Sequence, residues 1–137
     1  MLREAFDNDE RIDEIEQRIW AEGGRAVRDI AVTLGLPSGN AIEIDEALGI
    51  ISEIILGPGF NIEITEASES RVSGMITSCP MLNTHRALGV PAAGTHLHCQ
   101  AFCENGIQGM NPMYTTRYTK RMCRGDDCCE YTVELKR

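Results

Sequence analysis

The sequence predicts an α+β fold, in which N-terminal helices are followed by an antiparallel sheet with an inserted cysteine-containing helix. Two observations carry this prediction. Apolar residues recur at helical spacing up to residue 57, and from Phe60 onward they alternate with polar residues as in half-buried strands. The chain has 137 residues, the usual size of one domain. We therefore expect a single domain over residues 1–137, with a helical part at 1–57 and a sheet and cysteine-rich part at 58–137.

Two helices are expected in the first 34 residues. The first begins at an N-cap formed by Asn8 or Asp9. Gly23 and Gly24 are expected to interrupt it, because glycine costs about 1 kcal/mol in a helix interior. A second helix then ends before Gly35. The apolar stripe of the first helix consists of Ile12, Ile15 and Ile19, and that of the second consists of Ala26, Val27, Ile30, Ala31 and Leu34.

A third helix is predicted between Asn40 and Gly57. Asn40 followed by Glu43 resembles a capping box, and the run from Gly57 to Gly59 contains the residues that end helices. The residues expected on its buried side are Ile44, Ala47, Leu48, Ile51, Ile54 and Ile55. Nothing in these three helices indicates chemistry.

Four strands are predicted in the second part. Ile62 and Ile64 alternate with polar residues in a half-buried strand that includes Phe60, and residues 71–78 form its antiparallel partner. The last two strands meet at a turn over residues 124–127. One face of the third strand carries Tyr114, Thr116, Tyr118 and Met122, and one face of the last carries Cys129, Tyr131, Val133 and Leu135.

Two further helices are predicted between the strand pairs. A short one covers Thr84–Leu88, and a longer one runs from His96 to about Ile107. Cys99 and Cys103 are four residues apart on the longer helix. Helical spacing therefore places both thiols on one face, one turn apart, which suits chelation.

The charge of the chain restricts its partners. The net charge is −8 and the pI is near 4.8, which disfavours nucleic acid and anionic membranes. No apolar stretch is long enough to cross a bilayer. The sequence starts without an apolar signal segment, so we expect a cytoplasmic protein.

All six cysteines are candidate metal ligands, because thiols gathered in one place ionise together only when a cation compensates their charge. We expect either zinc or an iron–sulfur cluster, since both take thiolate ligands. No C-x-x-C pair is present to choose between them. Two other interpretations stay open, namely buried thiols acting as small apolar residues and a redox-active thiol pair. The candidate ligands are Cys79, Cys99, Cys103, Cys123, Cys128 and Cys129.

The last strand separates two of these thiols. Alternation points Cys129 inward and Cys128 outward, which disfavours a disulfide between them. Three histidines, His85, His96 and His98, are further candidates for a ligand or proton-transfer role.

The C-terminal half resembles a known group of domains. The run from Gly125 to Tyr131 fits the G-D-x-x-C-E-aromatic ending of vinyl-reductase-type small-molecule-binding domains and of the related L-2-amino-thiazoline-4-carboxylate hydrolase-like family. The second family is also similar in Cys79-Pro80, in the C-x-x-x-C helix and in Asn111-Pro112. The resemblance covers roughly residues 24–137.

This resemblance implies an α+β ligand-binding fold that is often dimeric. In the sensor domains of phenol-responsive regulators, three cysteines hold a zinc ion beside the ligand pocket. Cys129 matches the last of them and either Cys99 or Cys103 matches the first, whereas Cys123 stands closer to Cys129 than the family spacing requires. The hydrolase resemblance implies opening of a cyclic thiazoline by an activated water, and it transfers no catalytic residues to this chain.

The main functional prediction is a small metal-binding domain that binds a small molecule or docks on a larger enzyme complex. A related interpretation is an electron-transfer or assembly partner that docks through its acidic helical half. The expected partners are thus a small-molecule ligand, a larger protein or a second copy of the chain.

The alternative prediction is a hydrolase that opens a thiazoline or amide-like ring. One of the two helical cysteines, or a metal-bound water, would attack the ring carbon. His96 or His98 would serve as general base, and Asp126 or Glu130 would orient that base.

Overall fold

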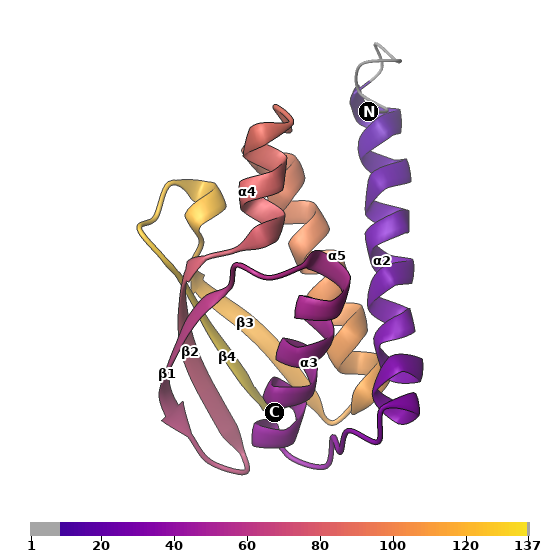
Figure 1. Ribbon diagram of the computed structural model, residues 1–137, viewed down its shortest axis with the longest axis vertical. Coiled ribbons are helices and arrows are strands. Elements are labelled where there is room, and N and C mark those ends of the chain that lie inside the picture. The colour runs from indigo at the N-terminus through magenta and orange to yellow at the C-terminus, as the bar shows by residue number, and fades with distance from the viewer. Residues whose placement is uncertain (1–8, 137) are drawn as a thin grey trace.

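The structure, a computed structural model, describes residues 9–136 and confirms the α+β fold. Helices α2 and α3 precede a four-stranded sheet into which α4 and α5 are inserted (Figure 1). The elements are α2 (Asp9–Thr33), α3 (Ala41–Leu56), β1 (Asn61–Ala67), β2 (Arg71–Ser78), α4 (Pro80–Ala87), α5 (Ala92–Met110), β3 (Tyr114–Lys120), the 3-10 helix η1 (Met122–Arg124) and β4 (Cys129–Leu135).

The sheet is antiparallel throughout, with the strand order β1-β2-β4-β3. Strands β2 and β4 are therefore central, and β1 and β3 lie at the edges. The backbone N–H of Ala41 donates to the carbonyl of Glu69, which ties the start of α3 to the turn between β1 and β2. This bond sets α3 across the inner face of the sheet.

The helices form two layers on one face of the sheet. Helices α3 and α5 pack against the sheet, and α2 lies on the far side of α5 (Figure 1). The core between α3, α5 and the sheet contains Ala41, Ile44, Val72, Ile107, Tyr114, Tyr131 and Val133. The core between α2, α3 and α5 contains Val27, Ala31, Ile51 and Phe102. Within residues 9–136, no helix combines the length and apolar character needed to span a bilayer.

Helix α2 is continuous, so the interruption predicted at Gly23 and Gly24 is wrong. A Cβ at position 24 would lie 2.5 Å from the carbonyl oxygen of Phe102 and 2.8 Å from Cβ of Asn105. The glycine therefore allows the backbones of α2 and α5 to meet, and this packing offsets its low helix propensity. Asn8, one of the two predicted N-caps, lies outside the described residues.

Helix α3 begins as predicted. Asn40 Oδ1 accepts from the N–H of Glu43 at 2.9 Å, and Glu43 Oε1 accepts from the N–H of Gly39 at 3.1 Å. Its last turn differs from the prediction, because Ile54 and Ile55 are exposed. The buried residues of α3 lie in its first three turns, between Ala41 and Ile51.

The half-buried strand predicted at the start of the sheet is wrong in its burial. Every residue of β1 is exposed, including Ile62 at 40% and Ile64 at 47%. The alternation itself is present, but the apolar face of this edge strand borders a cavity instead of a packed core.

Three boundaries also differ from those predicted. Helix α4 begins at Pro80. Proline is tolerated in the first helical turn because the N–H groups of that turn have no partner within the helix, so the N–H that proline lacks is not missed. Helix α5 begins at Ala92, four residues earlier than predicted. Met122 belongs to η1, which is capped at its C-terminal end by Gly125 with a φ of 95°.

Candidate functional site

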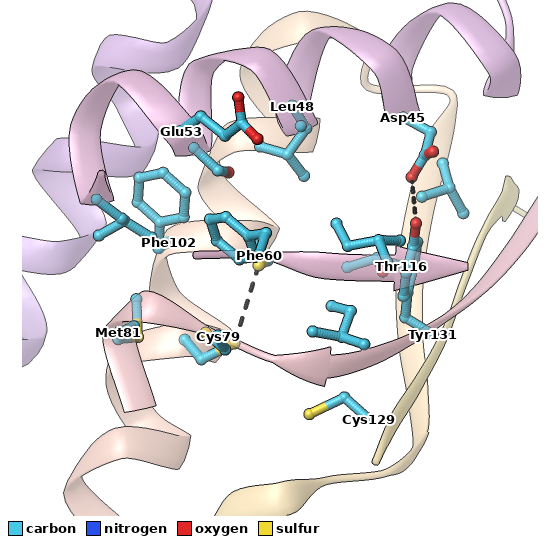
Figure 2. A pocket seen from close by; sticks show the side chains of 18 of the residues that line it. Asp45, Leu48, Glu53, Phe60, Cys79, Met81, Phe102, Thr116, Cys129 and Tyr131 are labelled. Carbon is cyan, nitrogen blue, oxygen red and sulfur yellow. Dashed lines mark hydrogen bonds between the residues drawn. The ribbon is translucent and has the colours of Figure 1, made fainter. Parts of the chain in front are cut away.

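A cavity of about 460 Å³ lies between α3 and the inner face of the sheet, with α5 closing one side (Figure 2). This volume falls in the range of about 300–1,000 Å³ that is typical of small-molecule sites. The sheet contributes Ile62, Ile64, Ile76, Thr116, Tyr118, Cys129, Tyr131 and Val133. The helices and connections contribute Asp45, Glu46, Leu48, Gly49, Ile50, Ser52, Glu53, Leu56, Phe60, Cys79, Met81, Cys99, Phe102 and Cys103.

The pocket opens between α3 and β1. Its lining residues Ile50, Ile62 and Ile64 are exposed, whereas Phe102 and Val133 on the opposite walls are buried. The wall is formed mainly by aliphatic, aromatic and sulfur-containing side chains. Because an unsatisfied polar group is costly in such surroundings, the few polar side chains of this wall set the orientation of a ligand.

One hydrogen bond crosses the pocket. The hydroxyl of Tyr131 on β4 donates to Asp45 Oδ1 on α3 at 2.9 Å (Figure 2). Burial raises the pKa of Asp45, and the hydrogen bond from Tyr131 partly opposes that rise. Burial also raises the pKa of Tyr131, and the nearby Asp45 charge raises it further. The pair therefore places a hydroxyl and a carboxyl group beside an otherwise apolar cavity.

A second polar contact joins α5 to β3. The sulfur atoms of Cys99 and Cys103 lie 4.0 Å apart on the same face of α5, and Cys103 Sγ lies 3.7 Å from the hydroxyl of Tyr118. The guanidinium carbon of Arg121 lies 4.1 Å from the centroid of the Tyr118 ring, which is a cation–π contact. These four residues link two thiols to one positive charge.

The two thiols of α5 differ in acidity. The hydrogen bond with Cys99 lowers the pKa of Cys103, against the effect of burial, and Tyr118 and Arg121 lower it further. The same hydrogen bond raises the pKa of Cys99, as does burial. Burial and the neighbouring thiols raise the pKa of Tyr118, so its hydroxyl stays protonated and can donate a hydrogen bond. Cys103 is therefore the thiol of this pair that favours the thiolate.

Three more cysteines approach the same end of the pocket. Cys79 follows β2, Cys123 lies on η1, and Cys129 begins β4. Burial raises the pKa of each, and repulsion from Cys99 raises each further. The pKa of Cys129 rises to about 11, although its sulfur accepts from the N–H of Met122 at 3.3 Å. The structure thus brings four segments of the chain, with one thiol or more each, into one neighbourhood.

Cys128 does not join this group. Its side chain is buried, and the charges that act on it come from Asp127, Lys120 and Glu130 instead of from other cysteines. All six cysteines are free thiols. Cys129 lines the pocket and Cys128 does not, as the alternation of β4 predicts.

The predicted metal site is tested by the arrangement of these donors. The soft thiols of Cys79, Cys99, Cys123 and Cys129 suit zinc or iron in type and number. However, within residues 9–136 no three histidine, cysteine, aspartate or glutamate side chains are arranged so that they could hold a metal ion. The thiols are neighbours without forming a coordination shell, and the metal stays a prediction.

Two of the histidines lie away from the pocket. His98 Nε2 lies 3.0 Å from Glu16 Oε2 on α2, and the His98 ring stacks on Trp20 with a centroid distance of 5.7 Å. His85 Nδ1 lies 2.9 Å from the hydroxyl of Thr95. Both histidines are buried between α2, α4 and α5. They support the packing of these helices.

The base and orienting residues predicted for a hydrolase do not meet the thiols of α5. His98 directly precedes Cys99, so it points about 100° away around the helix. His96 Nε2 lies 3.3 Å from a guanidinium nitrogen of Arg124, and burial lowers the pKa of His96. Asp126 accepts from the N–H of Arg121. The last of these residues, Glu130, accepts from the hydroxyl of Thr119 and lies 3.8 Å from Lys120.

Sequence reasoning missed four residues of the site. Tyr118 and Tyr131 were placed on inner strand faces by alternation, but no role was assigned to them. Asp45 lies three residues before Leu48 on α3, which places its carboxyl on the pocket side of the helix. Arg121 follows β3 and had no recognisable signal.

Two solved structures have a similar fold. Trafficking protein particle complex subunit 3 from Naegleria fowleri, solved covalently bound to palmitic acid, matches with 17% identity and a TM-score of 0.58, over 99% of this chain and 87% of that one. The phenol-responsive sensory domain of the transcription activator PoxR, solved with phenol, matches with 13% identity and a TM-score of 0.56, over 93% of this chain and 66% of that one.

These two structures agree with the α+β fold that the sequence resemblance implied. No curated protein matches the sequence significantly. The family model of L-2-amino-thiazoline-4-carboxylic acid hydrolase matches residues 2–133, which is nearly the whole chain. The chain therefore belongs to the L-2-amino-thiazoline-4-carboxylic acid hydrolase family.

Proposed function

We propose that the chain is a small-molecule-binding domain whose pocket takes an apolar organic ligand. The observation that carries the proposal is the cavity of about 460 Å³, whose sheet wall consists largely of aliphatic and aromatic side chains. Burial of apolar ligand surface contributes about 25 cal/mol per Å², so such a wall favours an apolar guest. The bound palmitic acid and phenol of the two similar structures are also apolar for most of their surface.

The Asp45–Tyr131 pair adds one polar contact to this pocket. Burial raises the pKa of Asp45, so its carboxyl group binds a proton more readily than an exposed carboxylate does, and the protonated form can donate a hydrogen bond as well as accept one. A ligand with one hydroxyl or carboxyl group at its end matches this pair. The exposed mouth between α3 and β1 gives such a ligand access from solvent.

The test introduces a large side chain into the pocket from the face of the sheet that lines it. Thr116 lines the cavity, and its neighbour Thr115 lies on the opposite face of β3. Thr116→Phe should weaken the binding of phenol and of a fluorescent fatty acid at least tenfold, measured by titration, whereas Thr115→Phe should not. Equal binding by both variants would show that the ligand lies elsewhere.

Hydrolysis is the second candidate function, and the family name favours it. Cys99 or Cys103 would then attack a thiazoline or amide-like carbon. Among the described residues, the groups that bond to Cys103 are Cys99 and Tyr118, and neither is a general base of the ordinary kind. Release of the ring-opened product from L-2-amino-thiazoline-4-carboxylate, followed by chromatography, tests this function directly. Activity that survives in both Cys99→Ser and Cys103→Ser would exclude these nucleophiles.

A metal at the grouped thiols is the third part of the proposal. The thiolate forms of Cys79, Cys99, Cys123 and Cys129 would repel one another, and a bound cation would neutralise that charge. Elemental analysis and a visible spectrum of protein purified without oxygen distinguish zinc from an iron–sulfur cluster. The homodimer implied by the family resemblance is tested on the same sample by light scattering.

A further inference from the structure

We propose that Cys103 is the attachment point for an acyl group, taken from an apolar acyl thioester and held as a thioester with its chain in the pocket. This inference rests on the proposed function, because the chain would occupy the same cavity. It adds a covalent bond and a named acceptor residue.

The position of Cys103 is the first argument. Its side chain lines the cavity from α5, and Phe102 and the inner face of β4 form the neighbouring walls. A chain bound at Cys103 Sγ can thus extend along apolar walls towards the mouth between α3 and β1. A small polar acyl group gains nothing from these walls, whereas each methylene of a longer chain that they bury stabilises the adduct.

The polar contacts of Cys103 are the second argument. The hydroxyl of Tyr118 lies 3.7 Å from Cys103 Sγ, and the guanidinium of Arg121 lies over the Tyr118 ring. Cys99 Sγ, at 4.0 Å, supplies a second weak donor. The Tyr118 hydroxyl and the Cys99 thiol are therefore donors beside the sulfur, with the positive charge of Arg121 close to them. These groups would stabilise the negative charge that develops on the carbonyl oxygen when the sulfur attacks a carbonyl carbon.

The absence of a base is the third argument, and it separates attachment from turnover. Among residues 9–136, no histidine or carboxylate hydrogen-bonds to Cys103. The two buried histidines are occupied between α2, α4 and α5. Hydrolysis of a thioester needs a water that is activated by such a base. Because no such base hydrogen-bonds to Cys103, we expect hydrolysis to be slow and the acyl group to stay on the sulfur.

The step balances without an oxidant or reductant. The Cys103 thiol loses its proton to solvent, and the thiolate attacks the carbonyl carbon of the acyl thioester. A new carbon–sulfur bond forms to Cys103 as the carbon–sulfur bond of the donor breaks. The donor leaves as a thiolate and takes up a proton from solvent.

The experiment uses the full chain, reduced, with acetyl-, octanoyl- or palmitoyl-coenzyme A, and intact mass as the readout. We expect one acyl group per chain from the two longer donors, little from acetyl-coenzyme A, and removal of the acyl group by neutral hydroxylamine. Peptide mapping of the wild-type protein should place the group on Cys103. Tyr118→Phe should slow the reaction several-fold, and Cys128→Ser, outside the pocket, should react like wild type.

Three results would overturn the inference: an adduct mapped to another cysteine, equal labelling by acetyl-coenzyme A, or continuous release of free acid. A Cys103→Ser variant that loses the adduct but still binds a fluorescent fatty acid reversibly supports both proposals. Reversible binding without any adduct in wild type rejects the acylation alone. If the wild-type protein does not bind the fluorescent fatty acid reversibly, the proposed function itself is rejected.

Discussion

Gly74 of β2 and Tyr131 of β4 are paired across the sheet, and the Tyr131 ring occupies the space that a side chain at position 74 would fill. A Cβ on Gly74 would lie 2.8 Å from both Cε1 and the hydroxyl oxygen of Tyr131. The missing side chain therefore lets the ring lie where its hydroxyl reaches Asp45 at 2.9 Å. The pocket depends on this combination of a small and a large residue.

Gly74→Ala should lower the free energy of unfolding by about 1–3 kcal/mol, because the added methyl group forces Tyr131 to move. It should also weaken ligand binding, since the ring then leaves Asp45. Denaturant unfolding and ligand titration measure the two effects. In a Tyr131→Ala background the same substitution should cost much less, and an equal cost in both backgrounds would show that the ring is not the cause.

Asp45 should make stability fall as the pH rises above about 4. Its pKa is raised in the folded state, so over the interval between the unfolded and folded pKa values the folded protein binds more protons. The free energy of unfolding therefore decreases with pH across that interval and stays lower above it. Asp45→Asn keeps an acceptor for Tyr131 and should flatten this decrease in denaturant unfolding curves. An unchanged pH profile would contradict the assignment.

Cys129 should destabilise the protein at alkaline pH. Its pKa is about 11 in the folded state against an ordinary value of 9.0, so the unfolded chain releases its proton first. The free energy of unfolding should fall between these two values, and Cys129→Ser should reduce the fall. Thermal unfolding across this range measures it.

A bound metal would reverse the sign of this pH dependence. Metal-held thiolates are deprotonated in the folded state, so stability would rise with pH towards the unfolded pKa of 9.0. If the predicted metal is present, Cys129→Ser should also lower the metal content and the melting temperature, whereas Cys128→Ser should leave the metal content unchanged. Full metal content in Cys129→Ser would exclude that residue as a ligand.

Gly23 and Gly24 should respond oppositely to alanine. At position 24 a Cβ would collide with the backbone of Phe102, so Gly24→Ala should cost about 1–3 kcal/mol or more. At position 23 the nearest atom, in the Phe102 ring, is 3.7 Å away, so Gly23→Ala should gain up to about 1 kcal/mol of helix propensity. Circular dichroism during thermal unfolding compares them, and similar effects would argue against close packing of α2 on α5.

Local signals in the sequence predicted local structure well. The Asn40–Glu43 cap involves residues that are three positions apart, so no tertiary contact is needed to form it. Alternation likewise placed Cys129 and Tyr131 on one face of β4. Each of these predictions depends only on the geometry of one element.

Predictions that depended on what an element packs against were less successful. The alternation of Ile62 and Ile64 predicts a face that avoids water, but a pocket and a core produce the same pattern. Gly24 lowers helix propensity locally, and only the position of α5 reveals why the helix continues. For His98 and Cys99, the helical spacing predicts that the two side chains point in different directions. It does not show which of these side chains faces the cavity.

The close approach of α2 and α5 at Gly24 has a consequence for how a ligand is exchanged. Helix α5, which carries two of the cysteines, has its backbone against α2 and its other side against β3 and η1. It is therefore held in place on both sides. The opposite side of the pocket, formed by α3 and β1, is less covered, and Ile50, Ile62 and Ile64 are exposed there. A ligand of the proposed kind would therefore enter and leave by displacement of α3 and β1, while α5 and its thiols keep their place.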